Sequence, residues 1–201
     1  GEYEWVLFTG PLRQTSGGWV ASELPVGKHK VKYDVGTNCQ SGTAEKEFEV
    51  KDLTAPVAIC DDELNISVGG EGIARVTVQD VDEGSWDNCQ LESLLLRRNL
   101  DDCLDVYLSD VLGISSLDEL TEEEFTNSHG EKGKRWFRYM DTQKMILVSY
   151  EPGKDGTNHY YTWWANEVYF TCCDIATSLD DFVVLELKAV DKAGNKNICW
   201  M

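Results

Sequence analysis

The chain has 201 residues, of which 18 are Lys or Arg and 36 are Asp or Glu, so its formal net charge is −18. This charge excludes general binding to nucleic acid, which needs a basic surface, and disfavours docking on anionic lipid. Hydrophobic residues make up 42% of the chain, so the composition is that of a folded protein and not of a disordered acidic tail. No apolar run approaches the roughly 20 residues that a membrane span requires.

Seven cysteines and three histidines limit the chemistry that the chain can perform. No pair of cysteines has the CxxC spacing of a zinc site, and His29, His129 and His159 are far apart in the sequence. Disulfides formed in an oxidising compartment are the better interpretation, and they predict an extracellular or cell-surface location. The odd number leaves at least one thiol without a partner inside this chain.

Strands are predicted along the first half of the chain wherever apolar and polar residues alternate. The segments concerned are residues 28–35, 45–50, 65–68, 73–78 and 91–98. The first two surround a turn rich in Gly and Asn and predict a β-hairpin; the third and fourth surround a Gly-rich tip and predict another. A stiff junction that ends at Pro56 separates the two hairpins. An acidic loop, residues 79–90, precedes the last of these strands.

Residues 99–166 interrupt this pattern. Two segments within them, 101–112 and 116–125, have a helical character, and Ser116 with Glu119 fits a capping box. Further strands are predicted at residues 137–150, 160–170, 181–190 and 196–201.

The first hairpin has a counterpart near the C-terminus. Residues 31–35, a Gly/Asn turn and a closing strand recur as residues 187–190, a Gly/Asn turn and a closing strand. The first copy continues into the junction at Pro56, whereas the second stops at Met201. We therefore expect the chain to be a segment of a tandem array; a coincidence between two ordinary hairpins is the alternative.

A resemblance to a known family is carried by residues 25–33, 50–60, 87–89 and 189–195, together with Cys199. These segments resemble the HYR (hyalin-repeat) module, an immunoglobulin-like β-sandwich. In that family a PVG-x-H-x-V-x-Y strand precedes a D-x-x-GN turn, and D-x-TAP-x-x-x-C opens the next module. Residues 80–89 and 170–174 look like the variant found in very long surface adhesins of gliding and predatory filamentous bacteria.

This resemblance implies a mostly β fold: an immunoglobulin-like β-sandwich repeat with a mixed α/β insertion. Residues 1–51 would be the C-terminal part of a first module, and residues 52–201 a second module with the insertion at about 99–166. The implied function is that of a structural and adhesive repeat in a secreted, disulfide-stapled filament or cell-surface adhesin. Its partners would be neighbouring repeats, copies of itself, or a cell-surface glycan or protein. No GxSxG, P-loop or HExxH motif occurs, so we predict that the chain is not an enzyme.

The resemblance also implies a disulfide. In an immunoglobulin-like topology the first strand of a module can lie beside the last, which would pair Cys60 with Cys199. The chain departs from the family at Ala193, where many members carry a Cys directly before Gly-Asn. We expect the adjacent Cys172 and Cys173 to substitute for it.

The remaining cysteines allow two pairings. Cys89 follows the acidic loop and should pair with Cys172 or Cys173, which leaves the other for Cys103. A bridge between the two adjacent cysteines would be strained. Cys39 occupies the turn of the first hairpin, and we expect its partner in sequence upstream of this chain.

An acidic constellation points to Ca²⁺. Residues 52–92 hold ten carboxylates and a single base, Arg75, and crowded like charges repel unless a cation neutralises them. Ca²⁺ takes about 6–8 oxygen ligands, which a loop such as 80–87 can supply. Because the loops of a sandwich cluster at its two ends, the turn at 191–195 should meet this loop. The candidate ligands are Asp52, Asp80, Asp82, Glu83, Asp87, Asp174, Asp191 and Asn195; a solvated acidic surface is the alternative.

Adjacent aromatic residues occur three times in the insertion, and neighbours in a strand point to opposite faces. Packing between the insertion and the sandwich is the favoured interpretation. The alternative function is a carbohydrate-binding module in which Tyr161, Trp163 and Trp164 stack on sugar rings. Four bases in residues 132–138 also contrast with nine carboxylates in residues 101–124, which suggests an electrostatic contact between neighbouring copies.

Overall fold

The computed structural model describes residues 12–22, 24–36, 40–127, 130–153, 156–177 and 182–201. Over these residues the chain is mostly β, with several antiparallel sheets. Its internal contacts divide it into two units, residues 1–53 and 54–201. Strands β1–β4 belong to the first unit, and the strands from β5 onward belong to the second.

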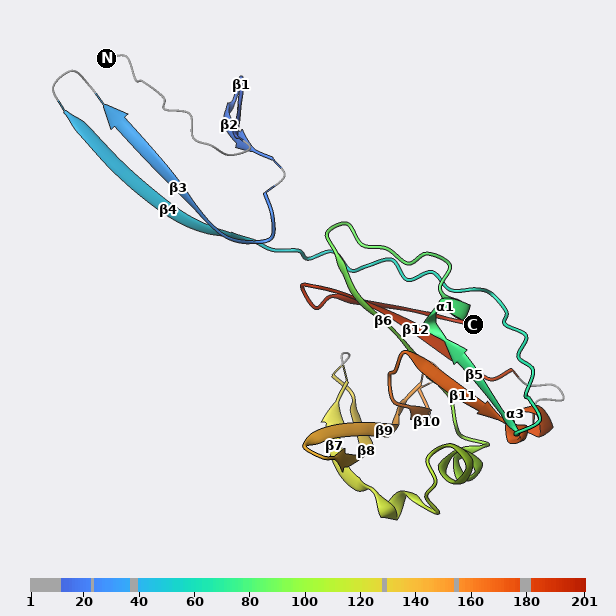
Figure 1. Cartoon of the computed structure of the whole chain (residues 1–201). Coiled ribbons are helices and arrows are strands. Elements are labelled where there is room, and N and C mark those ends of the chain that lie inside the picture. Colours follow the sequence, from blue (N-terminus) through green and yellow to red (C-terminus); the bar gives the residue numbers. More distant parts are fainter. Residues whose placement is uncertain (1–11, 23, 37–39, 128–129, 154–155, 178–181) are drawn as a thin grey trace. The chain divides into compact units, whose positions relative to one another are not determined.

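The described part of the first unit consists of two antiparallel hairpins (Figure 1): β1 (Leu12–Thr15) with β2 (Gly18–Ala21), and β3 (Gly27–Gly36) with β4 (Ser41–Val50). The β3–β4 pair confirms the first predicted hairpin. Lys30 of β3 forms ion pairs with Glu45 (3.1 Å) and Glu47 (3.5 Å) of β4. Such exposed pairs each add little stability. They favour this register nevertheless, because a slip by one residue would move the charges to the other face.

The second unit contains a two-stranded sheet β11–β5, a three-stranded sheet β13–β12–β6 and a four-stranded sheet β10–β9–β8–β7, all antiparallel. Its strands are β5 (Ile73–Thr77), β6 (Leu91–Arg98), β7 (Thr121–Thr126), β8 (Lys132–Met140), β9 (Gln143–Pro152), β10 (Asn158–Thr162), β11 (Glu167–Thr171), β12 (Leu185–Asp191) and β13 (Lys196–Trp200). Its helical segments are α1 (Val78–Val81), α2 (Leu104–Val106), the π-helical η1 (Tyr107–Val111), the 3-10 turn η2 (Leu117–Glu119) and α3 (Cys172–Thr177).

One apolar core lies between the β11–β5 pair and the strands β6 and β12. Alternate residues of these strands point inward, as the period of two in the sequence requires. The buried members of this core are Ala74, Val76, Val78, Val81, Leu96, Val168, Phe170, Leu185 and Leu187. Burial of one such large aliphatic side chain contributes about 1.5–3 kcal/mol. Two antiparallel layers around a shared core are consistent with a β-sandwich.

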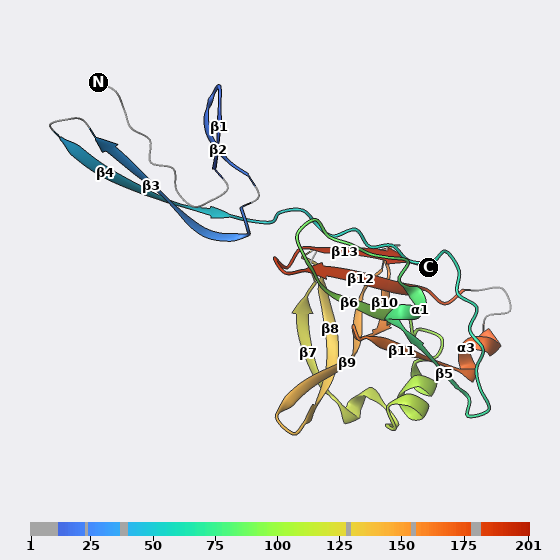
Figure 2. The same cartoon turned by 45° about the horizontal axis from the view of Figure 1, so that its top comes forward.

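A second core belongs to residues 99–166. Its buried members are Leu100, Tyr107, Leu108, Trp136 and Val148. Leu100 follows β6, and Tyr107 and Leu108 belong to η1. Trp136 and Val148 come from the four-stranded sheet, which lies below the β13–β12–β6 sheet in Figure 2. Isolated bridges from Leu96 to Ala165 and from Asn99 to Tyr161 connect the two parts of the unit. The helix predicted at 101–112 is thus found in shorter form.

The prediction of a helix at residues 116–125 is wrong. Only the turn η2 is helical there, and the chain continues as β7. The cause is pairing with β8: Glu122 contacts Lys134 at 2.9 Å, and Glu123 contacts Arg135 at 2.5 Å. Opposite charges on adjacent strands stabilise a sheet. These contacts join the acidic residues 101–124 to the basic residues 132–138 within one chain. The charge pattern predicts such a contact between neighbouring copies.

The strand predicted at residues 65–68 is also absent, and β5 has no hairpin partner before it. Instead β5 pairs with β11, with Ile73 opposite Thr171. Local alternation cannot reveal a partner that lies so far along the chain. The aromatic segment predicted as one strand at 160–170 is divided into β10 and β11. Between them Ala165 forms an isolated bridge with Leu96 of β6.

Strand β6 ends in two arginines whose side chains leave it on opposite faces. Arg98 is fully buried, and its Nη1 donates to Asp174 Oδ1 at 2.5 Å. Its guanidinium carbon lies 4.7 Å from the centre of the Phe170 ring. Asp174, in α3, also accepts a hydrogen bond from Thr171 N at 2.6 Å. A buried charge of this kind depends on its partner, because no water replaces a lost carboxylate.

We expect Asp174→Asn to lower the free energy of unfolding by about 3–5 kcal/mol, because it leaves the Arg98 charge buried without a counter-charge. Glu122→Gln is the matched control: it removes a carboxylate from an exposed pair and should cost less than about 1 kcal/mol. Urea denaturation followed by Trp fluorescence measures both. A loss in Asp174→Asn no larger than in the control would contradict this prediction.

Candidate functional site

Two of the predicted cation ligands, Asp80 and Asp82, serve local structure around α1 instead, and a third, Glu83, has no such role. Asp80 accepts hydrogen bonds from Thr77 N (2.8 Å) and Thr77 Oγ1 (2.7 Å), which hold the pKa of its carboxyl below the ordinary value. Asp82 accepts from Ser85 N at 2.8 Å and closes the turn after the helix. Glu83 is exposed. A fourth predicted ligand, Asp174, is engaged in the buried pair described above.

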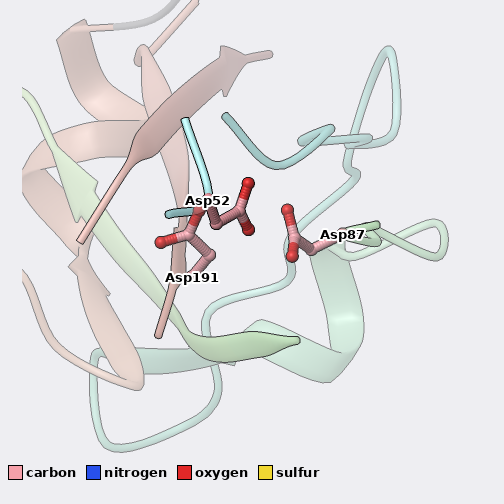
Figure 3. Close-up of side chains that lie close together, drawn as sticks. All are labelled: Asp52, Asp87 and Asp191. Atoms are coloured by element: carbon pink, nitrogen blue, oxygen red, sulfur yellow. The ribbon is translucent and has the colours of Figure 1, made fainter. Parts of the chain in front are cut away.

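Three other predicted ligands do converge. One carboxylate oxygen from each of Asp52, Asp87 and Asp191 lies within 4.8 Å of the others (Figure 3). Asp191 ends β12 and is paired with Leu91 at the start of β6, which brings the 79–90 loop to the same place. Oxygens on opposite sides of a Ca²⁺ ion, each about 2.3–2.6 Å from it, are separated by nearly this distance. We call these three residues the acidic cluster.

Hydrogen bonds fix the orientation of Asp191, which is 2% exposed. It accepts from Asn195 N at 2.8 Å and from Asn195 Nδ2 at 2.7 Å. Burial raises the pKa of Asp191, but these bonds, with those from Gly194 and Ala193, outweigh it and leave the pKa below the ordinary value. The carboxylate is therefore charged at neutral pH. Asn195 Nδ2 also donates to Thr54 O at 3.3 Å, which holds the start of the second unit against this turn.

Asp87 presents an oxygen that has no partner among the described residues. Its Oδ2 accepts from Cys89 N and Gln90 N, both at 2.8 Å, and so orders the chain before β6. Its Oδ1 is buried and accepts no hydrogen bond. A buried carboxylate oxygen without a donor is costly, and a bound cation would satisfy it. The donor set of the acidic cluster thus fits a hard cation such as Ca²⁺.

Two disulfides lie in the described part of the chain. The expected Cys60–Cys199 bridge has a Cα–Cα distance of 6.1 Å and joins residues 139 positions apart. The Cys103–Cys173 bridge has a Cα–Cα distance of 5.8 Å and a separation of 70. It is one of the two alternatives that the sequence left open. It ties the insertion to α3.

The expected bridge from Cys89 to the remaining adjacent cysteine, Cys172, is not formed. Cys172 opens α3 beside Gly72, just before β5, whereas Cys89 lies close to Asp87 before β6. The sequence spacing gave no indication that these loops are apart. Cys39 lies outside the described residues.

The three aromatic residues proposed as a sugar platform do not form one exposed surface. Tyr161 is 5% exposed. The guanidinium carbon of Arg97 lies 4.2 Å from the Tyr161 ring centre and 4.5 Å from that of Trp164. Trp163 meets Phe125 edge to face instead. Packing within the chain is therefore the role that this geometry favours for Tyr161 and Trp164.

Arg97 is also the centre of a buried charge cluster that sequence reasoning missed. It is ion-paired with Glu151 of β9, and its Nε lies 2.7 Å from Glu186 Oε2 of β12. Ser149 Oγ donates to Glu151 at 3.1 Å. Strands from the sandwich-like part and from the insertion are thus joined by one guanidinium. The only available signal was a pair of arginines at the end of the apolar run in β6.

Lys188 of β12 lies beside this cluster. Its Nζ is 3.9 Å from the centre of the Trp164 ring, and it forms no ion pair with any described residue. Burial lowers the pKa of Lys188 to about 7, and the charges of Lys196 and Arg97 act in the same direction. The carboxylates of the cluster oppose this shift without cancelling it, because both are engaged by Arg97. A lysine that is half uncharged near neutral pH is chemically distinct from its neighbours.

The sequence suggests that His159 is isolated, but in the structure it has two polar partners. Its Nδ1 contacts the carboxylate of Asp101, and its Nε2 lies 2.6 Å from Thr157 Oγ1. Asp101 also accepts from Tyr160 N at 2.6 Å, so it fastens β10 to the chain that follows β6. A Cβ on Gly153 would lie 2.6 Å from His159 Cδ2, so only glycine fits against this ring.

Comparisons with known protein families, with curated proteins and with solved structures find no match for this chain. Among the described residues, no helix has both the length and the apolar character needed to cross a bilayer. The geometry of the sites therefore has to carry the functional conclusion.

The buried amine makes stability depend on pH. The folded-state pKa of Lys188 is about 7 and its ordinary value is 10.5, so between these values the unfolded chain binds more protons and stability rises with pH. We expect Lys188→Met to be more stable than the wild-type protein at pH 6. This advantage should shrink steadily from pH 7 to pH 10. Urea denaturation of both proteins at several pH values measures it, and a difference that stays constant would contradict the assignment.

Proposed function

We propose that the chain is a structural and adhesive repeat of a secreted, disulfide-stapled filament or cell-surface adhesin. The second unit would be an immunoglobulin-like module of the HYR type carrying residues 99–166 as an insertion, in line with the resemblance of the sequence. Its two antiparallel layers around one core support this assignment. Its disulfides support an extracellular location, since such bridges persist in oxidising compartments.

The observation that carries the proposal is the position of the Cys60–Cys199 disulfide. The second unit begins at Thr54, and the bridge links its seventh residue to a residue two positions before Met201. Tension that enters before Thr54 and leaves after Met201 passes through this covalent link. The core and the sheets between the two cysteines then carry almost none of the load. A disulfide at this position suits a protein that bears mechanical tension.

The second bridge protects the insertion in the same way. Cys103 lies just before α2, and Cys173 lies in α3. The bridge keeps residues 99–166 attached to the sandwich-like part even when local structure opens. It also closes a loop of the unfolded chain, which typically contributes about 2–4 kcal/mol. Neighbouring repeats, copies of the chain and a cell-surface glycan or protein are the proposed partners.

Ca²⁺ is the proposed cofactor, held by the acidic cluster with Asn195 and backbone oxygens nearby. The convergence of Asp52, Asp87 and Asp191 and the unsatisfied Oδ1 of Asp87 support it. A bound ion would remove the repulsion among the three carboxylates and fix the 79–90 loop to the end of β12. Its role would be structural and not catalytic.

A carbohydrate-binding module remains the alternative proposal. It has less support in the geometry, because Tyr161 is buried and the ring of Trp164 contacts two cations of the chain itself.

Pulling the chain from both ends tests the load-bearing role. In the oxidised protein the stretch between Cys60 and Cys199 cannot extend. Reduction should therefore lengthen the unfolding step of the second unit by about 450–500 Å, at roughly 3.3–3.6 Å per residue. The double variant Cys60→Ser, Cys199→Ser should lengthen the step by about 230–250 Å without a reductant, because the Cys103–Cys173 bridge still closes 70 of these 139 residues.

The matched control is Cys103→Ser with Cys173→Ser, whose loop lies inside the longer one and whose removal should leave the short step unchanged in the oxidised protein. Single-molecule force spectroscopy resolves these lengths. Equal steps in oxidised and reduced wild-type protein would mean that Cys60–Cys199 carries no load.

Thermal and urea denaturation with Ca²⁺ or with a chelator tests the cofactor. At a concentration 100 times its Kd, Ca²⁺ should stabilise the protein by about 2.7 kcal/mol. Asp87→Asn should abolish this gain, and without Ca²⁺ it should be no less stable than the wild-type protein because it removes one repelling charge. Asp80→Asn, in the same loop but outside the acidic cluster, should keep the gain. An unchanged midpoint in wild-type protein would remove Ca²⁺ from the proposal.

A further inference from the structure

Three side chains near the start of β10 form a connected row that the proposed function does not use. Thr157 places its Oγ1 2.6 Å from Nε2 of His159, and Nδ1 of the same ring contacts the carboxylate of Asp101. A carboxylate only accepts hydrogen bonds, so Nδ1 carries the proton, and Nε2 of the neutral ring accepts the hydrogen of the hydroxyl group. A hydroxyl, an imidazole and a carboxylate in this order are an arrangement that activates an oxygen nucleophile.

The imidazole and the carboxylate are held in place before any reaction. Asp101 accepts from Asn99 Nδ2 at 3.2 Å and from Tyr160 N at 2.6 Å, so both of its oxygens are fixed. The imidazole lies against the backbone of Gly153, where a Cβ would come within 2.6 Å of the ring. A base whose position is fixed in advance needs no rearrangement before it accepts a proton.

The hydroxyl group of this row is accessible. Thr157 is exposed, whereas His159 is partly buried, so a small molecule can approach the hydroxyl from solvent without entering a cavity. A backbone donor lies next to it. Tyr160 N donates to Asp101 and not to β9, and alternate residues of a strand direct their N–H groups to the same edge. The N–H of Asn158, which directly follows Thr157, therefore faces this edge and can donate to an oxygen that becomes negatively charged.

We propose that Thr157 is an acyl-acceptor site: its hydroxyl oxygen, activated by His159, takes the acyl group from activated esters of small carboxylic acids. This activity goes beyond the proposed structural role and does not depend on it. Because Thr157 is exposed, the site offers little surface for binding, and the ester has to bring a good leaving group. The step modifies the chain itself, so it is compatible with a protein that is not an enzyme.

The step exchanges one ester for another. An Oγ1 lone pair of Thr157 attacks the carbonyl carbon, the carbonyl electrons move to the oxygen, and the hydroxyl proton passes to His159 Nε2. The carboxylate of Asp101 stabilises the positively charged ring that results. The electrons on the oxygen then return and expel the leaving group, which takes the proton from Nε2 as an alcohol or phenol. One threonine and one ester thus yield one acyl-threonine and one alcohol or phenol.

Acetylation of the folded chain tests this assignment. The probe is p-nitrophenyl acetate at pH 8, with samples quenched in acid at timed intervals and acetyl groups located by peptide mass mapping. The internal control is Thr121, an exposed threonine of β7. General-base catalysis contributes about 10²–10⁴-fold in enzymes, and we expect acetylation of Thr157 to be at least tenfold faster than that of Thr121. Acetylation of Thr157 at or below the rate of Thr121 would overturn the proposal.

Two variants test the part played by the imidazole. Thr157→Ser keeps a hydroxyl group at this position and should be acetylated there at least as fast as the wild-type protein. His159→Gln removes the base and should lower the rate at Thr157 at least tenfold, while acetylation of the exposed amine of Lys192 stays the same. Circular dichroism checks the fold of both variants. An unchanged rate at Thr157 in His159→Gln would also overturn the assignment, because the hydroxyl would then react without the imidazole.

Discussion

Two buried guanidinium groups at the end of β6 are the interaction on which the second unit depends. Arg98 points into the sandwich-like part, where Asp174 and the ring of Phe170 surround it, while Arg97 points toward the insertion. Burying two charges costs several kcal/mol each, and ion pairs only partly repay that cost. The pairs are therefore better understood as selecting one arrangement of strands. A packing in which β9 or α3 lay elsewhere would leave an arginine buried without a counter-charge.

The same constraint explains the unusual groups around it. Burial lowers the pKa of Lys188, and the charges of Lys196 and Arg97 act in the same direction. The two nearby carboxylates form no ion pair with Lys188, because Arg97 binds both of them. The Cys103–Cys173 disulfide crosses the boundary between the insertion and α3, close to where Arg98 meets Asp174. The disulfide thus holds α3 to the start of the insertion, and the ion pair holds α3 to the end of β6. Only the disulfide resists force, because an ion pair gives way once water enters.

Sequence reasoning succeeded where a local period was sufficient. Strands β3 and β6 lie at the predicted positions because alternate residues must face one side of a sheet. It failed at residues 116–125, where three glutamates after a serine look like a helix start, but Glu122 and Glu123 form ion pairs with Lys134 and Arg135 on β8. Of eight predicted cation ligands, Asp87 and Asp191 meet because the ends of β12 and β6 are paired, a relation between distant strands. Asp80 has the same chemistry but is used as a cap. The residue type alone cannot distinguish an aspartate of the acidic cluster from one that caps a helix.

The net charge of −18 gives the disulfides and the acidic cluster a common physical basis. Self-repulsion of a strongly charged chain favours its expanded state, and this term grows at low ionic strength. Disulfides counter this effect in the unfolded state, because they limit how far the unfolded chain can expand. A cation at Asp87 and Asp191 would act on the folded state directly, at the end of the unit where Thr54 meets Asn195. The two devices are independent in mechanism, so each should stabilise the protein whether or not the other is present.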